Sequence, residues 1–295
     1  MRRKIISLAK STNVVTIPFS WCEKNSLKKG DSVDVSENED SLVISPVEKL
    51  KKADIDISWM DPMIKRVLGA YYKSGYDEMR ITYSTDKEKD IADEVIREEF
   101  IGFEIISHNN ERKTITAKSV AEPTFNDFDN MLRRMILLIA SMGEEIRDNM
   151  KDGEMLKKTA LLDKDVNKIA DYCRRAVNRN AFLKISKDFK KNTALYFIVE
   201  QLEKIGDEFR DYANSKNPMS AMDAFREVCE YYGEFYDIFY KFKLEKMKSF
   251  GDERYKLRKK FDEMIARSPS EELVICRNIV EKTFDMSGPL MVLFI

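Results

Sequence analysis

Histidine, cysteine, glycine and proline are scarce in this chain of 295 residues. Only His108 could serve Ser-His-Asp or Cys-His catalysis, and a multi-histidine metal centre is excluded. The four cysteines lie far apart, which excludes a CxxC zinc or redox motif and favours a reducing, cytoplasmic compartment. With 10 Gly and 7 Pro, the composition favours long helices over a turn-rich all-β fold.

Neither charge nor hydrophobicity is concentrated along the chain. The 51 Lys and Arg balance 52 Asp and Glu, so a polybasic nucleic-acid-binding surface is not expected, although a local basic patch remains open. Apolar runs do not reach the ~18 residues of a membrane span, and the first residues lack the apolar core of a signal peptide. We therefore expect a soluble, cytoplasmic protein with no membrane span.

The first 46 residues have the pattern of short strands. Val33 and Val35 alternate with polar residues, as do Leu42 and Ile44, which is the period of two expected for half-buried strands. A unit of ~45 residues is small for a core of its own, so we expect it to form an obligate dimer. The positive charges that precede the first acidic residue of the chain are those of Arg2, Arg3, Lys4 and Lys10.

Three segments of this unit carry a family resemblance: KSTNVVTIP at 10–18, LKKGDSV at 27–33 and LVISP at 42–46. In order and spacing they resemble the AbrB/SpoVT swapped-hairpin domain, which implies an interlaced β dimer over residues 1–46. In transcription factors of that family the basic side chains contact DNA, here Arg2, Arg3, Lys4 and Lys10. DNA-binding members usually have Gly-Arg where this chain has Thr12-Asn13, so the domain could instead serve only to dimerise.

Residues 57–120 have the mixed pattern of a small α/β domain, after a charged linker from Glu48 to Asp56. The expected elements are a helix from Asp61-Pro62, a strand over 79–83, a helix over 86–100, and a hairpin that turns at His108-Asn109-Asn110. The segment contains no glycine-rich phosphate loop and no nucleophile elbow. A surface role for His108 is therefore the simpler interpretation, and we expect no enzymatic activity.

Residues 124–295 have the 3.6-residue period of amphipathic helices. Six helices joined by short turns are expected, which is typical of two three-helix bundles in tandem. Their apolar stripes begin after Thr124 and then cover 155–182, 195–212, 222–240, 242–265 and 273–286. The apolar tail Gly288–Ile295 is expected to fold back onto the bundle, with docking into a partner groove as the alternative. The predicted fold class is multi-domain α+β.

A pair of acidic residues is repeated in this helical region. Glu203 and Asp207 recur 78 positions later as Glu281 and Asp285, and residues four apart share one face of a helix. Glu200 lies one turn before the first pair. The repetition indicates two related three-helix repeats, each with a carboxylate patch on its third helix.

The second helix of the first repeat has the same spacing in Asp163 and Asn167. If that helix packs beside the third, Asp163, Asn167, Glu203 and Asp207 converge on one cation. Oxygen ligands without histidine or thiolate suit Mg²⁺, Ca²⁺, Mn²⁺ or iron. A solvated acidic surface without a metal is the alternative.

The same helices carry a second resemblance. LEKIGD at 202–207 and DKDVNKI at 163–169 are similar to motifs of PhoU, the phosphate-uptake regulator, whose architecture is two tandem three-helix bundles. With the N-terminal domain and the run YKSGYDEMRI at 72–81, the whole chain resembles archaeal PhoU-like regulators. The resemblance implies contacts with phosphate transporter or signalling proteins, and metal on carboxylate pairs at Asp163, Asn167, Glu200, Glu203, Asp207, Glu281 and Asp285.

Two departures weaken the metal sites that this resemblance implies. Asn167 stands where the family has an acid, so the first site lacks one charge. In the second repeat Lys256 lies four residues after Asp252, where a ligand is expected. That second site is therefore half-formed or held by salt bridges instead.

Three functions from different classes follow. The first is a cytoplasmic, homodimeric regulator of phosphate uptake that acts by protein contact. The second is an AbrB-type DNA-binding transcriptional regulator with a PhoU-like sensor bundle. The third, a metal-dependent enzyme of the carboxylate-bundle kind, is disfavoured because ferritin-like di-iron sites use Glu-x-x-His pairs, which this chain lacks.

Overall fold

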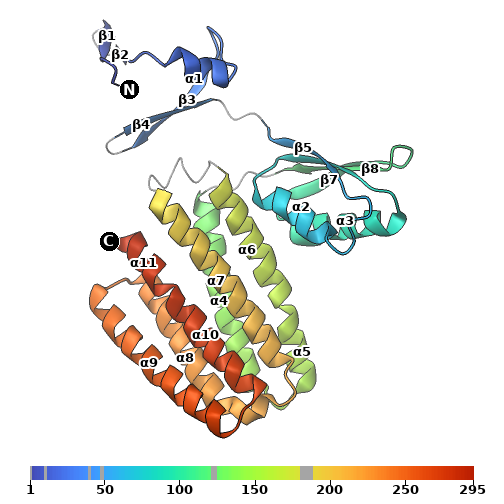
Figure 1. Cartoon of the computed structure of the whole chain (residues 1–295), viewed down its shortest axis with the longest axis vertical. Coiled ribbons are helices and arrows are strands. Elements are labelled where there is room, and N and C mark those ends of the chain that lie inside the picture. Colours follow the sequence, from blue (N-terminus) through green and yellow to red (C-terminus); the bar gives the residue numbers. More distant parts are fainter. Residues whose placement is uncertain (1, 10–11, 39–40, 47–49, 121–124, 180–188) are drawn as a thin grey trace. The chain divides into compact units, whose positions relative to one another are not determined.

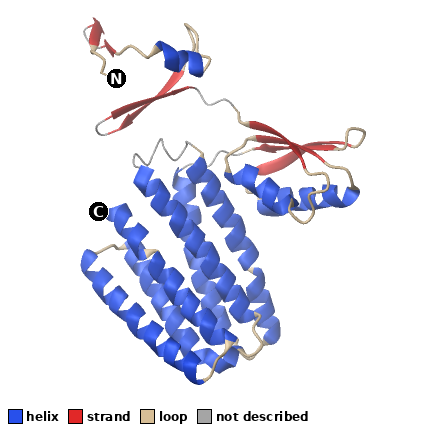
Figure 2. Ribbon diagram, in the orientation of Figure 1, coloured by secondary structure: helices blue, strands red, loops and turns tan. Residues whose placement is uncertain are grey.

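The structure, a computed structural model, describes residues 2–9, 12–38, 41–46, 50–120, 125–179 and 189–295. The chain forms two compact units, Met1–Leu50 and Lys51–Ile295. Strands occupy the N-terminal part and long helices the C-terminal part, so the predicted multi-domain α+β class is confirmed (Figure 2).

The N-terminal unit consists of two small antiparallel hairpins and a short helix. Its elements are β1 (Ile6–Ala9), β2 (Thr12–Val14), α1 (Phe19–Lys24), β3 (Val33–Asn38) and β4 (Ser41–Pro46). In the second hairpin Val35 lies opposite Ile44, as the alternating pattern predicts. None of the described side chains of this unit is buried, and Leu8 and Leu42 are 73% and 63% exposed. The described side chains of the unit therefore form no core within one chain.

The second unit begins with a four-stranded sheet of order β5-β6-β8-β7. Its elements are β5 (Lys52–Asp56), α2 (Ile64–Lys73), β6 (Glu78–Thr82), α3 (Asp86–Glu99), β7 (Phe103–Asn109) and β8 (Thr114–Ser119). The β5–β6 pair is parallel and the other two pairs are antiparallel. Helices α2 and α3 cover one face (Figure 1), where Met79, Ile81 and Ile115 are buried against Leu68 and Ile96.

Three sequence expectations for this sheet domain are wrong. The second half of the predicted linker is strand β5, because Ile55 is buried in the core and the strand pairs in register with β6. The helix expected from Asp61-Pro62 begins at Ile64. His108 and Asn109 are the last residues of β7, so the hairpin turns after them, around Lys113, which has a positive φ of 48°.

The loop between β5 and α2 is held by one buried carboxylate, that of Glu88. It accepts hydrogen bonds from the backbone N–H of Trp59 (2.6 Å), Ser84 (2.8 Å) and Thr85 (3.0 Å), and from the Ser84 hydroxyl (2.8 Å). Burial raises the pKa of Glu88, but these bonds outweigh burial and lower the pKa to about 2. The loop presents Trp59 82% exposed, at a positive φ of 64°.

The remainder of the second unit is helical. Its helices are α4 (Phe125–Asp148), α5 (Gly153–Leu161), α6 (Asp163–Asn178), α7 (Phe189–Ala213), α8 (Met222–Tyr240), α9 (Leu244–Arg267), α10 (Glu271–Asp285) and α11 (Ser287–Phe294). A 3-10 turn, Pro218–Ala221, precedes α8. No helix in the described ranges is both long and apolar enough to cross a bilayer.

The two groups of three long helices share one hydrophobic core rather than forming two separate bundles. Aromatic residues join α7 to α8, since Tyr212 stacks on Phe225 with ring centroids 4.0 Å apart and Phe209 meets the same ring edge-on at 5.6 Å. The Tyr232 hydroxyl of α8 donates to the backbone oxygen of Ile136 in α4 (3.1 Å). One buried cluster therefore extends from α4 to α11.

One predicted helix is divided in two in the structure, and the C-terminal tail packs as expected. The helix expected over 155–182 is two helices, α5 and α6, separated at Leu162; its last residues, 180–182, lie outside the described residues. The C-terminal tail is helix α11, which packs along α7 with Leu290 buried, as the fold-back expectation had it.

Buried Arg175 of α6 joins the helical region to the sheet domain. Its guanidinium donates to the backbone oxygens of Tyr72 (2.9 Å) and Tyr76 (2.7 Å) at the end of α2. It also lies 3.4 Å from an Asp77 carboxylate oxygen and 4.9 Å from the ring centroid of Phe103. The positive charge of Arg175 thus lies at the C-terminal end of α2, which is the negative end of that helix's dipole.

Gly206 allows α6 and α7 to approach closely. A Cβ at this position would lie 2.9 Å from a methyl carbon of Val166. We predict that Gly206→Ala lowers the free energy of unfolding by about 1–3 kcal/mol, because the added methyl overpacks the contact. Gly233→Ala in α8, where a Cβ would meet nothing within 4 Å, is the matched control and should raise it by about 0.5–1 kcal/mol. Urea denaturation followed by circular dichroism measures both changes, and equal effects would contradict the packing argument.

Candidate functional site

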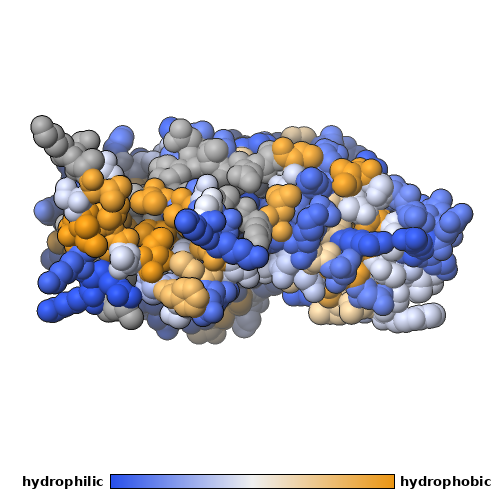
Figure 3. Space-filling model, turned by 90° about the horizontal axis from the view of Figure 1, so that it is seen from above, coloured by the Kyte–Doolittle hydropathy of each residue, from blue (hydrophilic) through white to orange (hydrophobic). Residues whose placement is uncertain are grey.

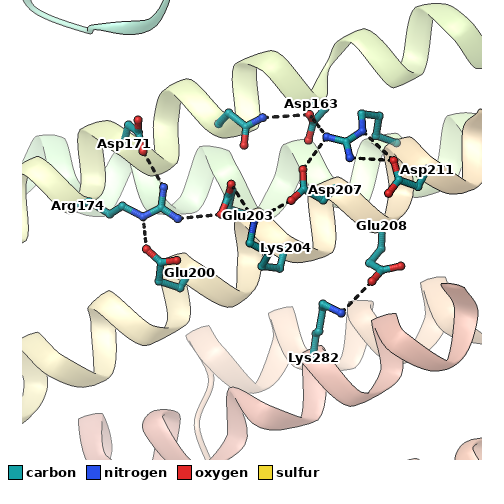
Figure 4. Close-up of polar contacts among 12 residues, drawn as sticks. Asp163, Asp171, Arg174, Glu200, Glu203, Lys204, Asp207, Glu208, Asp211 and Lys282 are labelled. Carbon is teal, nitrogen blue, oxygen red and sulfur yellow. Dashed lines mark hydrogen bonds and ion pairs between the residues drawn. The ribbon is translucent and has the colours of Figure 1, made fainter. Parts of the chain in front are cut away.

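Acidic and basic side chains alternate along the contact between α6 and α7 (Figure 4). The two helices run antiparallel, so that the start of α6 lies beside the end of α7. We call this set the ion-pair ladder; its members are Asp163, Asp171, Arg174, Glu200, Glu203, Lys204, Asp207, Arg210 and Asp211. Six carboxylates and three cations form it, which leaves an excess of negative charge.

At one end of the ladder, Arg174 is held by three carboxylates. Its guanidinium donates to Asp171 (2.7 Å), to Glu203 (2.9 Å) and to Glu200. The Arg174 side chain is only 6% exposed. Burial lowers the pKa of Arg174, but the three negative charges outweigh burial and raise it. Charge-assisted hydrogen bonds of this kind fix the geometry of both partners.

At the other end, Arg210 is the cation on which the predicted acids converge. One nitrogen of its guanidinium donates to Asp163 (2.9 Å) and to Asp207 (2.6 Å). The other two nitrogens donate to Asp211 (2.9 and 2.8 Å). The Asn167 amide donates to the same Asp163 oxygen that accepts from Arg210 (3.0 Å). The structure thus brings Asp163, Asn167 and Asp207 together, around a side chain of the protein itself.

Lys204 fills the middle of the ladder. Its ammonium donates to Asp207 (2.9 Å) and to Glu203 (3.3 Å), both on its own helix. The side chain is about half exposed, so this ion pair contributes little to stability on its own. Lys204 links the Arg174 end to the Arg210 end through the acidic pair that the sequence singled out.

Two oxygens near the Arg210 end have no partner. Asp163 Oδ1 and Asn167 Oδ1 are both buried and accept no hydrogen bond. Burial raises the pKa of Asp163, against the hydrogen bond from Arg210, which lowers it. An unpartnered buried carboxylate oxygen is costly, and a cation or a water molecule is the group that would satisfy it.

Metal binding at this end stays a prediction. In the described part of the chain no three Asp, Glu, Cys or His side chains already have the spacing of a metal site. The donor set of Asp163, Asn167 and Asp207 is all oxygen, which fits a hard divalent cation. Such an ion would take over carboxylate oxygens that now accept from Arg210.

The second predicted patch is built differently. Glu281 pairs with Arg254 of α9 and lies 3.9 Å from the guanidinium of Arg258. Asp285, one turn on, is exposed, and its pKa is raised by partial burial and by the charge of Glu281. Lys256 pairs with Glu253 instead. Two arrangements were expected for this site, a half-formed metal site and a set of salt bridges. The structure has the salt bridges.

The sequence analysis missed the arginines that neutralise the acidic pairs. Arg210 lies three residues after Asp207, a spacing that indicates an ion pair along one helix. Arg174 has the same spacing from Asp171, but its other partners, Glu200 and Glu203, lie on another helix and could not be predicted in this way. Glu208, which accepts from Lys282 of α10 (2.8 Å), was missed for the same reason.

The predicted DNA-contacting residues lie at the start of the N-terminal unit. Arg2, Arg3 and Lys4 are exposed and precede β1, and Lys10 lies outside the described residues. The three described residues place three positive charges at consecutive positions. Such a cluster suits phosphate groups, although it carries no base specificity.

A family model matches this unit: residues 7–52 match the model described as antidote-toxin recognition MazE, bacterial antitoxin. The matched residues include those that resemble the AbrB/SpoVT swapped-hairpin domain. Comparisons with curated proteins and with solved structures gave no match. The match therefore concerns the N-terminal domain, and the helical region rests on its own geometry.

Proposed function

We propose that this chain is a homodimeric, DNA-binding regulator whose helical region makes regulatory contacts. The observation that carries the proposal is the N-terminal unit without a core. Its described side chains include none that is buried, and large apolar residues such as Leu8 and Leu42 are open to solvent. Figure 3 shows patches of exposed hydrophobic side chains on the face that it draws. A second copy of the unit, interlaced with the first, supplies the missing core.

The DNA part of the proposal rests on charge and on the family match. The match to the MazE model over 7–52 and the resemblance to AbrB/SpoVT domains both support a swapped-hairpin dimer. Dimerisation would double the cluster of Arg2, Arg3 and Lys4, which suits the regularly spaced phosphates of a duplex. A reducing, cytoplasmic location agrees with this role.

Regulation of phosphate uptake by protein contact is the second candidate. The observation that favours it is the pairing of the two PhoU-like motifs: DKDVNKI lies in α6 and LEKIGD in α7, and the two helices pack together at Gly206. In this function the acidic face of the ion-pair ladder would contact a phosphate transporter or a signalling protein, with or without a metal ion. Neither candidate function involves catalysis.

The dimer is tested by placing acids in the proposed shared core. We expect Val35→Glu with Leu42→Glu to halve the mass measured by light scattering, because two charges cannot be buried there without partners. Ser20→Glu with Ser32→Glu, two exposed polar positions of the same unit, is the control and should leave the mass unchanged. A dimer that survives the first pair would show that another surface joins the chains.

The DNA contact is tested by salt-dependent gel shift on promoter fragments. Affinity should fall steeply as salt rises, and Arg2→Gln, Arg3→Gln and Lys4→Gln together should weaken binding by about tenfold or more at ~100 mM salt. The control replaces Lys157, Lys158 and Lys164, which are exposed on α5 and α6, by Gln. Failure to shift DNA even at ~50 mM salt would favour protein contact as the function.

The metal site is tested without disturbing the buried arginines. We expect Asp163→Asn with Asp207→Asn to lower Mn²⁺ affinity by about tenfold or more, because both carboxylates are lost while their shape is kept. Calorimetric titration and elemental analysis of dialysed protein measure the change. Glu154→Gln with Glu263→Gln, two residues outside the ladder, is the control. Equal metal content in all three proteins would reject the site.

A further inference from the structure

The turn between α8 and α9 carries a dense group of lysines. Lys241, Lys243, Lys246 and Lys248 fall within eight residues, with Glu245 as the one acid among them. All four lysines are exposed, and none forms an ion pair with a residue in the described ranges. Two of the three later lysines of the same helix behave differently.

Two of the three later lysines are paired, and Lys259 forms no ion pair with a described residue. Lys256 lies 2.8 Å from Glu253, and Lys260 pairs with Glu227. The density of unpaired lysines at one corner of the helical region is therefore a feature of the turn, although Lys259 shows that it is not confined to the turn. Lys246 lies near enough to Glu234 for its charge to lower the pKa of that carboxyl, against burial, which raises it.

Exposed apolar side chains lie at the same corner. Leu244, between the lysines, is 56% exposed, and Phe294 at the end of α11 is 50% exposed. The ring of Phe294 stacks on that of Phe242 in the turn, with centroids 4.9 Å apart and planes 11° from parallel. The end of α11 therefore lies beside the α8–α9 turn, as Figure 1 also shows. We call this set the lysine-apolar corner; it consists of Lys241, Lys243, Leu244, Lys246, Lys248 and Phe294.

We propose that the lysine-apolar corner binds the surface of a bilayer that contains anionic lipids. Leu244 and Phe294 enter the boundary between headgroups and acyl chains, and the lysine ammonium groups contact lipid phosphates. Lysine suits this position because its apolar stem lies along the acyl region while its charge stays in water. The contact is peripheral and reversible.

Charge and residue type favour a lipid surface over other anionic partners. DNA offers no acyl layer for Leu244 and Phe294. An acidic protein would be recognised by arginine and aromatic side chains in a preformed surface, whereas lysine is depleted at protein interfaces. Four exposed lysines beside exposed Leu244 and Phe294 match a bilayer surface, because anionic lipids diffuse in the bilayer and can gather around the lysines.

Vesicle co-sedimentation of the full chain tests the proposal. We expect binding to phosphatidylcholine vesicles with about 30% phosphatidylglycerol, weaker binding as salt rises, and no binding to phosphatidylcholine alone. Lys246→Gln with Lys248→Gln should weaken the binding by about 10- to 30-fold, since each lysine near an anionic surface contributes about fivefold. Leu244→Ser should weaken it severalfold without changing the charge.

Two matched controls locate the contact. Lys157→Gln with Lys158→Gln removes the same charge from α5 and should leave vesicle binding unchanged. Arg2→Gln, Arg3→Gln and Lys4→Gln test whether the N-terminal cluster is responsible instead. Absence of binding to anionic vesicles, a loss that follows either control, or full binding by Leu244→Ser would overturn the proposal. Circular dichroism of each variant verifies that it is folded.

Discussion

Two adjacent arginines of α6 hold the second unit together. Arg174 is held by Asp171 of its own helix and by Glu200 and Glu203 of α7, and Arg175 caps the end of α2. Both guanidiniums are almost fully buried. A buried charge that loses its partners costs several kcal/mol, so each arginine requires its neighbours to stay in place. The positions of α7 and of the sheet domain relative to α6 follow from this requirement.

Much of the fold could be predicted from periodicity, and the exceptions have physical reasons. Strand β5 was missed because Ala53 and Ile55 are its only apolar residues in a charged run. The break between α5 and α6 was missed because Leu162 interrupts neither the apolar stripe nor the helix propensity. When a helix break does not disturb the 3.6-residue spacing of the hydrophobic residues, the sequence pattern cannot reveal it.

The candidate site was predictable in position but not in its partners. The spacing predicted that Asp163 and Asp207 would converge if their helices packed side by side. The structure brings both to within hydrogen-bonding distance of one guanidinium nitrogen. The cation between them is Arg210. Its position depends on the rotamer that the Arg210 side chain adopts between the two packed helices, and residue spacing does not determine that rotamer. Gly206 belongs to the sequence motif and also explains the geometry. Because it has no side chain, α6 and α7 can pack closely enough for Asp163 and Asp207 to contact the same guanidinium.

The carboxylate of Glu88 has a consequence for the loop that it holds. Because its folded pKa of about 2 lies below the ordinary value, its contribution to stability is complete above that ordinary value and is lost progressively as the pH falls from there toward 2. The carboxylate that accepts the hydrogen bonds of the Trp59 loop therefore stays charged above that ordinary value. Trp59 therefore stays exposed on the sheet domain at neutral and at mildly acidic pH alike.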